Sequence, residues 1–245
     1  MTGLGRALAE NRTAQAAEIA CVFLVAAVVI SVGWRVVGSN PLARQAVVWI
    51  ANVLMLVTVW ISLRVRGQTW ESLGLPFRFV GFRALGRTVL QAVIALAFAL
   101  AAFVAGSLVM VNLTPAPPQA DLSGYTYLQG NLPMLLLTLA GVYVVSSFGE
   151  EVLYRGFLIT RLAAIGHHDK ASWSLAVVTS AVVFGLAHFD WGIVGVVQTA
   201  FMGLALALAY LVTKRNLWAL VLAHACMDTM LLVQMYGAPP PGGGT

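Results

Sequence analysis

The stretch LPMLLLTLAGVYVVSSFGEEVLYRGFLITRLAAI, residues 132–165, decides the fold of this 245-residue chain. It begins with an apolar run, Leu132–Phe148, close to the ~20 residues that a helix needs to cross a membrane. A second apolar run, Gly156–Ile165, follows after a short charged break that contains Glu150, Glu151 and Arg155. We therefore expect a membrane-spanning helix that carries charged side chains and continues to about Ile165.

The rest of the chain has the same character. Hydrophobic residues make up 60% of it and charged residues only 9%, whereas a soluble domain carries about 25% charged residues. This excludes a disordered chain and a nucleic-acid binder, and it argues strongly against a water-soluble enzyme. Long apolar runs occur at Ile19–Val37, Ala46–Leu63, Thr88–Val111, Leu132–Phe148, Ser172–His188, Ile193–Val212 and Leu217–Tyr236. The sequence predicts an all-α fold, a polytopic transmembrane bundle of seven to eight helices without an internal repeat.

Three regions are expected along the chain. Residues 1–131 hold N-terminal transmembrane helices and an amphipathic connection, Gly67–Arg87, in which arginines alternate with aromatic residues as in segments that lie on lipid headgroups. Residues 132–236 form a helical core that carries the candidate site, and residues 237–245 form a disordered tail rich in Pro and Gly.

The orientation follows from the basic residues, because cytoplasmic loops are enriched in Lys and Arg. With the N-terminus in the cytoplasm, twelve of the 14 basic residues lie inside and two, Arg35 and Arg44, lie outside. The net charge of +5 is therefore explained mostly by basic residues that mark the cytoplasmic side of the membrane. The protein is expected to be integral to a membrane, the plasma membrane of a prokaryote, with a cytoplasmic N-terminus.

Ionisable residues inside a span are costly and are usually functional. Here they gather in the second half of the chain, at Glu150, Glu151, Arg155, His188, His224 and Asp228. Glu150 and His188 each lie 19 residues from Asp169, so an antiparallel helical hairpin would place them at equal depth. With a rise of ~1.5 Å per residue, Glu150 and His224 are both expected ~10 Å below the cytoplasmic surface.

Spacing within single helices separates the roles of these residues. Glu151 and Arg155 are four residues apart and face each other, which favours a buried ion pair. Glu150 is rotated ~100° away and stays available for another partner. His224 and Asp228 are also four residues apart, so the carboxylate can orient the imidazole or act beside it.

Two mechanisms fit one carboxylate with two histidines. In the first, Glu150, His188 and His224 bind zinc or another divalent metal that keeps an open water position. In the second, Glu150 and His188 deprotonate a water that attacks a peptide carbonyl, and His224 donates to the oxyanion. Composition does not separate these alternatives, so the need for a cofactor stays open.

Three motifs carry a family resemblance. They are Glu-Glu-x-x-x-Arg at 150–155, Phe-x-x-x-His at 184–188 and His-x-x-x-Asp at 224–228. In this order they resemble the CPBP intramembrane protease family, which includes type II CAAX prenyl endopeptidases and abortive-infection and bacteriocin-processing relatives. The resemblance covers roughly Leu132–Tyr236, so that the helical core 132–236 is CAAX-protease-like.

The resemblance implies site roles and a reaction. Glu150 would be the water-activating base and His188 its partner, while His224 and Asp228 would bind the scissile carbonyl. The supporting residues would be Glu151, Arg155 and Phe184, with Phe184 packed beside His188. The CAAX branch carries Asn where this chain has Asp228, so an oxyanion role for residue 228 is open, and orienting His224 or binding a metal are its alternatives.

The implied activity is hydrolysis of a peptide bond near the cytoplasmic membrane face by a membrane-embedded hydrolase, a CAAX-type peptidase or metalloprotease. The expected partners are membrane lipid and a peptide or prenylated peptide, and no nucleic acid. The alternative is a non-proteolytic membrane protein, either a bacteriocin-immunity scaffold or a proton-coupled transporter, that uses the same Glu/His cluster.

Overall fold

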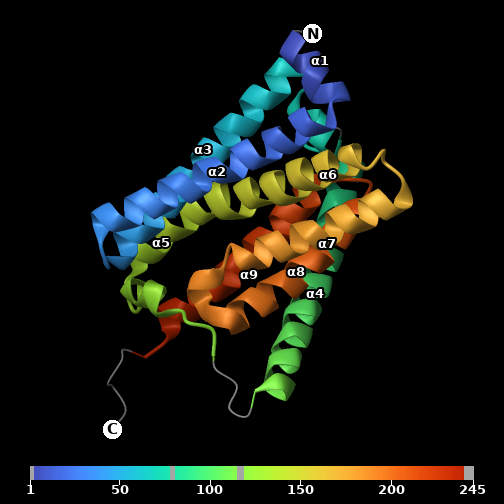
Figure 1. Cartoon of the computed structure of the whole chain (residues 1–245). Helices are drawn as coiled ribbons and strands as arrows, with labels where there is room; N and C mark the ends of the chain where they lie inside the picture. The colour runs from blue at the N-terminus through green and yellow to red at the C-terminus, as the bar shows by residue number, and fades with distance from the viewer. Residues whose placement is uncertain (1–2, 78–80, 115–118, 240–245) are drawn as a thin grey trace.

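The computed structural model describes residues 3–77, 81–114 and 119–239, and these are helical with short connections and no strand. The all-α prediction is confirmed (Figure 1). Arg78 and Phe79 of the amphipathic connection and residues 240–245 of the expected tail lie outside the described residues. The α-helices are α1 (Gly3–Glu10), α2 (Arg12–Val37), α3 (Pro41–Val65), α4 (Phe82–Leu113), α5 (Leu132–Val142), α6 (Thr160–Ile165), α7 (Lys170–Leu186), α8 (Gly192–Val212) and α9 (Leu217–Gly237).

Within the described part of the chain, six helical segments are long and apolar enough to cross a membrane. They are Arg12–Val37, Pro41–Val65, Phe82–Leu113, Leu132–Ile165, Phe189–Val212 and Leu217–Gly237. The seventh predicted run, Ser172–His188, forms the shorter apolar helix α7, which ends at Leu186 and leaves His188 in the following turn. The protein is thus a polytopic membrane bundle in which α7 is shorter than a usual span.

The segment that decided the fold is one continuous helix from Leu132 to Ile165, so the expected continuation past the charged break is confirmed. Between α5 and α6 it winds as two π-helical stretches, η3 (Tyr143–Phe148) and η4 (Glu151–Ile159). A π-helical turn inside an α-helix is rare and is frequent at functional sites. Here the two stretches flank Glu150.

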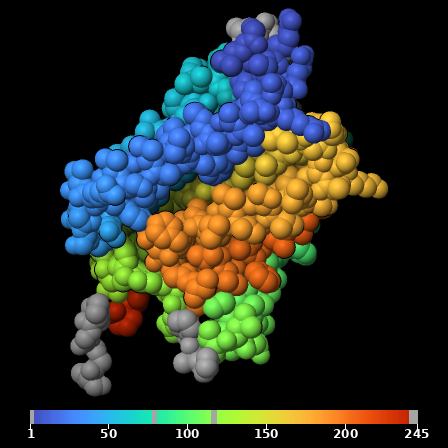
Figure 2. Space-filling model, viewed as in Figure 1, coloured from blue at the N-terminus to red at the C-terminus, as the bar shows by residue number. Residues whose placement is uncertain are grey.

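A tight turn joins this helix to α7. His167 and His168 both adopt positive φ angles, of 68° and 59°, and Asp169 caps α7 by accepting a hydrogen bond from the backbone N–H of Ser172 at 2.7 Å. Because a side-chain acceptor satisfies one of the free N–H groups at a helix start, this cap fixes where α7 begins. The hairpin tip stands at the edge of the bundle (Figure 2).

Small residues bring α7 and α8 close together. A Cβ atom on Gly203 would lie 2.9 Å from a ring carbon of Phe184 and 3.5 Å from the Cα atom of Ala181. A Cβ atom on Gly185 would lie 2.6 Å from the Cβ atom of Ala200. Such approaches are typical of membrane helices that pack through glycine and alanine.

Part of the amphipathic connection packs into the bundle rather than lying on its surface. The short 3-10 helix η1 (Trp70–Leu73) and the three residues after it cross the end of the bundle where α8 and α9 meet. Leu73 and Leu75 are fully buried, and the backbone N–H of Leu217 donates to the carbonyl of Gly74 at 3.1 Å. We call residues 70–76 the plug.

The bundle has two chemically different ends (Figure 1). The basic end contains α1, the plug, the α6–α7 turn and the α8–α9 turn, together with ten described Lys and Arg residues. The mouth end contains the α2–α3 turn, η2 (Ser123–Leu128), η5 (Phe189–Trp191) and the C-terminal end of α9, with Arg35 and Arg44 as its described basic residues.

Candidate active site

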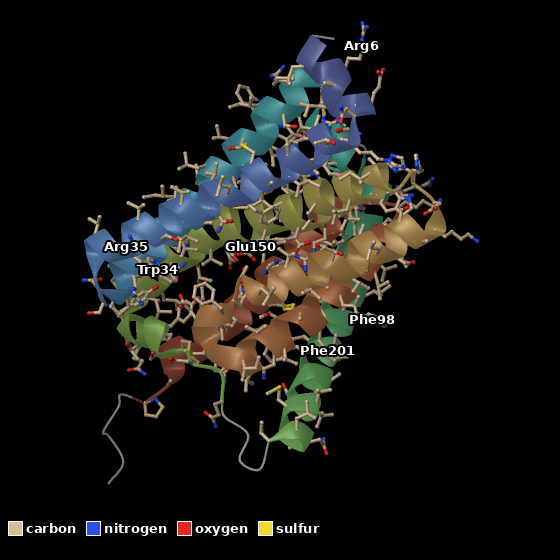
Figure 3. The ribbon with its side chains drawn as sticks, viewed as in Figure 1. Arg6, Trp34, Arg35, Phe98, Glu150 and Phe201 are labelled. Carbon is tan, nitrogen blue, oxygen red and sulfur yellow. The ribbon has the colours of Figure 1, made fainter. Side chains whose placement is uncertain are left out.

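The four predicted catalytic residues line one cavity of about 610 Å³. They come from three places in the fold: Glu150 from the π-helical region, His188 from the end of α7, and His224 and Asp228 from α9. Glu150 lies in the interior of the bundle, far from Arg6 and Arg35 (Figure 3). The hairpin and α9 therefore bring these side chains together although up to 78 positions separate them in sequence.

His224 lies at the centre of the carboxylates. Its Nδ1–H donates to Oε1 of Glu151 at 2.8 Å, and its Nε2 faces Oε2 of Glu150 at 3.9 Å and Oδ1 of Asp228 at 3.7 Å. The imidazole is buried, with 4% of its side chain exposed. Because Glu151 fixes Nδ1, the Nε2 edge is directed at the cavity and at the other two carboxylates.

Glu151 and Arg155 form the ion pair that their spacing predicts, with Nη1 and Oε1 2.8 Å apart and both side chains fully buried. Nη2 of Arg155 donates to the carbonyl of Gly203 at 3.4 Å, and the guanidinium stacks 4.3 Å from the ring centre of Phe184. The spacing did not predict that Glu151 also accepts from His224. Glu151 is thus part of the site and not only the partner of an arginine.

His188 is held in one ring orientation. Its Nδ1 lies 2.8 Å from the carbonyl oxygen of Phe184, which accepts the hydrogen bond, so Nδ1 carries the proton. In the neutral ring this leaves Nε2 as an acceptor. The ring of Phe184 packs against His188 with centroids 4.8 Å apart and against His224 at 6.1 Å, so Phe184 lies between the two imidazoles.

Asp228 has a partner that the sequence analysis missed. The hydroxyl of Ser147 donates to Oδ2 of Asp228 at 2.7 Å. Ser147 precedes Glu150 by three residues and so lies near it on the same side of the helix. This spacing is the sequence feature from which Ser147 could have been predicted as a site residue. This bond directs the other oxygen of Asp228 towards His224.

A family model matches the part of the chain that carries the site. Residues 132–230 match the family model described as type II CAAX prenyl endopeptidase Rce1-like. This Rce1-like segment is 99 of the 245 residues and contains all the predicted site residues, and the match confirms the resemblance to intramembrane proteases. Neither the curated proteins nor the solved structures that were searched contain a match to the chain.

The chain is therefore an integral membrane protein with a segment that matches a family of membrane endopeptidases. At family level this supports a protease that acts on peptide or prenylated protein substrates.

Two aromatic residues complete the cavity, and neither was predicted. Trp191 of η5 packs on His188 with centroids 4.9 Å apart, and Tyr125 of η2 packs on Trp191 at 6.3 Å. Burial and the negative charge of Asp228 raise the pKa of Tyr125, so its hydroxyl stays protonated at neutral pH. Tyr125 lies outside the Rce1-like segment, in a connection whose sequence gives no catalytic signal.

The predicted metal site is not assembled by these side chains. Among the described residues, no group of three His, Cys, Asp or Glu side chains is arranged to hold a metal ion. Glu151 and the carbonyl of Phe184 engage the Nδ1 atoms of His224 and His188, as is usual for metal-binding histidines, which leaves their Nε2 atoms as the possible ligands. The positions of Glu150, His188 and His224 in this arrangement nevertheless do not fit a metal, and we derive no step through one.

The remainder of the cavity is largely apolar. Its wall continues from the carboxylates along α2, α3 and α4, with Phe23, Ile30, Met55, Leu100 and Phe103 among the lining residues. A volume of about 610 Å³ lies within the range of ordinary ligand sites. The site thus joins a polar catalytic corner to an apolar chamber inside the membrane bundle.

Proposed function

We propose that the protein is an intramembrane endopeptidase in which Glu150, assisted by His188, activates the attacking water. The observation that carries the proposal is the state of the Glu150 carboxylate. Glu150 lines the cavity, and its Oε2 atom is buried and has no hydrogen-bond partner among the described residues. A buried carboxylate oxygen without a partner is an acceptor ready for a water molecule.

The reaction then proceeds in two steps. Glu150 accepts a proton from the water while Nε2 of His188 accepts its second hydrogen bond, and the water oxygen bonds to the scissile carbonyl carbon. The carbonyl oxygen becomes an oxyanion, and Nε2–H of His224 donates to it. When the C–N bond breaks, Glu150 returns its proton to the departing amine, so the base is restored.

The surrounding residues hold these groups in place. Glu151 fixes Nδ1 of His224, and Arg155 balances the charge of Glu151. Asp228, held by Ser147, faces Nε2 of His224 and favours its protonated form by charge. In this proposal Asp228 orients His224 rather than contacting the oxyanion itself.

The apolar chamber supports a substrate with an apolar or lipid-bearing segment next to the scissile bond. A prenylated peptide of the CAAX type is the substrate that the family points to, and the chamber wall suits an isoprenoid as it suits other apolar chains. The partners in this proposal are membrane lipid and peptide. His224 lies seven residues from the start of α9 and hence ~10 Å along this helix from the basic end.

The test is peptide cleavage by protein reconstituted in liposomes, with products identified by mass spectrometry. Cleavage is compared between a farnesylated peptide and an unmodified peptide of the same sequence, which shows whether the enzyme requires the lipid. Cleavage by wild type that is lost in Glu150→Ala and kept in Glu10→Ala, an exposed control in α1, is the expected result. Cleavage that survives Glu150→Ala contradicts the proposal. Proton flux without cleavage supports a transporter, and partner binding without cleavage supports a scaffold.

A further inference from the structure

The connection between α4 and α5 is fastened at two points, and Tyr125 lies between them. On one side the backbone N–H of Asp121 donates to the carbonyl of Trp191 at 3.0 Å. On the other side the backbone N–H of Gly130 donates at 3.0 Å to the carbonyl of Tyr236, which is in the last turn of α9. The short helix η2, which carries Tyr125, is therefore held against η5 and α9.

The apolar side of η2 packs on α9. Leu128 of η2 is fully buried in a cluster with Leu135 of α5 and Leu232 of α9. Leu232 follows Asp228 by four residues, so both lie on one side of α9. The helix η2 thus packs beside the face of α9 that carries the site, and this packing brings Tyr125 to the cavity.

The phenol of Tyr125 belongs to the polar part of the cavity, which it lines together with Glu150, His224 and Asp228. Burial raises the pKa of Tyr125, and so do the charges of Asp228 and Glu150, so its hydroxyl is protonated and lies within electrostatic range of both carboxylates. A hydrogen bond from the side chain of Trp191 lowers this pKa. Because an indole N–H only donates, the phenolic oxygen accepts this bond and its own O–H stays available to donate.

The proposed reaction needs a donor that the other polar groups of the site do not supply. An oxyanion is usually held by more than one N–H or O–H donor, and His224 offers one, its Nε2–H. Ionised Asp228 only accepts hydrogen bonds, and the hydroxyl of Ser147 already donates to it. The guanidinium of Arg155 is fully buried against Glu151. A second donor must therefore come from another residue that lines the cavity.

Two tyrosines are among the described residues that line the cavity, and their positions differ. Tyr154 follows Glu150 by four residues on the same helix, so it lies on the side of the base. Tyr125 comes from a separate segment, and of the neighbouring charges that of Asp228 raises its pKa most. Oδ1 of Asp228 is 3.7 Å from Nε2 of His224. Tyr125 therefore lies on the side of the oxyanion donor.

We propose that the hydroxyl of Tyr125 is a catalytic donor that binds the oxyanion together with Nε2–H of His224. This inference rests on the proposed function. When the water oxygen bonds to the scissile carbonyl carbon, an electron pair of the C=O bond moves to the oxygen, and both donors hydrogen-bond to it without losing their protons. When the C–N bond breaks, the C=O bond forms again and Tyr125 is unchanged. The active site thus includes a residue outside the Rce1-like segment.

Tyr125→Phe tests this role, with Tyr127→Phe as the matched control. Phenylalanine keeps the ring that packs on Trp191 with centroids 6.3 Å apart, so the variant should unfold at the temperature of wild type. We expect kcat to fall by about 10²-fold and KM to change by less than about twofold, because the oxyanion forms only in the transition state. Tyr127 is in the same short helix, but its hydroxyl lies 3.5 Å from that of Thr138 and it is not among the described residues that line the cavity. Tyr127→Phe should therefore match wild type.

A second measurement does not depend on turnover. A peptide with a phosphinate in place of the scissile amide mimics the tetrahedral oxyanion and is bound by the contacts of the transition state. Tyr125→Phe should bind this phosphinate about 10²-fold more weakly than wild type. Affinity for the intact peptide is compared between Glu150→Gln and the double variant Tyr125→Phe/Glu150→Gln, neither of which should cleave it, and the two affinities should be equal.

A kcat for Tyr125→Phe within about threefold of wild type, or an unchanged affinity for the phosphinate, contradicts the role of Tyr125 and leaves the proposed function standing. A higher KM at unchanged kcat also overturns it, because that result indicates equal binding of substrate and transition state. Loss of kcat in Tyr154→Phe but not in Tyr125→Phe assigns the donor to Tyr154 instead. If wild type cleaves no peptide, the proposed function fails and this role fails with it.

Discussion

The Oε1 atom of Glu151 lies 2.8 Å from Nδ1 of His224, a residue 73 positions further along the chain. This bond joins the π-helical region to α9 across the centre of the bundle. The same oxygen also accepts from Arg155, so one buried carboxylate neutralises an arginine and fixes the ring of His224, which lines the cavity. In the proposed mechanism this atom therefore serves both the fold and the reaction.

The shared role gives a prediction for the Glu151–Arg155 pair. Glu151→Gln leaves Arg155 buried without a counter-charge, and breaking a buried ion pair from one side costs about 3–5 kcal/mol. The double variant Glu151→Leu/Arg155→Met removes both charges and should regain most of that stability. Thermal unfolding in detergent measures this. Cleavage should stay low in both variants because His224 has lost its negatively charged partner, and in the double variant its hydrogen-bond acceptor as well. Full activity in the double variant contradicts a role for Glu151 in the site.

Asp228→Asn tests whether the charge at residue 228 is needed. The asparagine carbonyl still accepts from Ser147 and keeps the side chain beside His224 without the negative charge, so we expect kcat to stay within about tenfold of wild type. Asp228→Ala removes the bond to Ser147 and the contact with His224 and should lower kcat by about 10²-fold. Asp121→Asn is the matched control outside the site. If Asn and Ala at residue 228 are equally inactive, the negative charge itself is required.

Metal removal should leave the enzyme active. The side chains of the described site form no three-ligand group for a metal ion. After dialysis against a chelator, with metal content measured on the same sample, we expect less than about a twofold change in cleavage. A large loss that added zinc restores is the contrary result, and it would favour the metal-bound water mechanism.

Gly203→Ala tests the packing that positions Phe184. The new Cβ atom would lie 2.9 Å from the Phe184 ring, which separates His188 from His224. Overpacking of this kind costs about 1–3 kcal/mol, and cleavage should fall as the two imidazoles shift. Gly86→Ala in α4 is the matched control, because nothing lies within 4 Å of its Cβ position. Equal behaviour of the two variants in unfolding and cleavage contradicts a positioning role for Phe184.

Much of the core could be read from sequence because its signals are local. The apolar runs gave the helices, and the four-residue spacings gave the Glu151–Arg155 and His224–Asp228 contacts. The equal number of residues from Asp169 to Glu150 and to His188 predicted that both lie at one site, and both line the same cavity. That prediction assumed regular α-helical geometry, which the π-helical stretches do not have.

The features that could not be predicted from the sequence depend on contacts between segments far apart in the chain. Tyr125 reaches the cavity only because η2 folds against η5, and no pattern near residue 125 indicates this. The plug was expected on the membrane surface because it belongs to the Gly67–Arg87 connection, whose arginine-aromatic pattern fits that location. Its burial depends on contacts with α8 and α9. The early end of α7 at Leu186 is another such effect, since the apolar run itself continues to His188.

The most direct test of the account is the kcat of Glu150→Gln on a cleaved peptide. Glutamine keeps the size of the side chain but cannot take a proton from water, so kcat should fall by about 10³-fold while the unfolding temperature stays close to that of wild type. Glu10→Gln should match wild type in both measurements. A kcat for Glu150→Gln within about tenfold of wild type would contradict the assignment of Glu150 as the base.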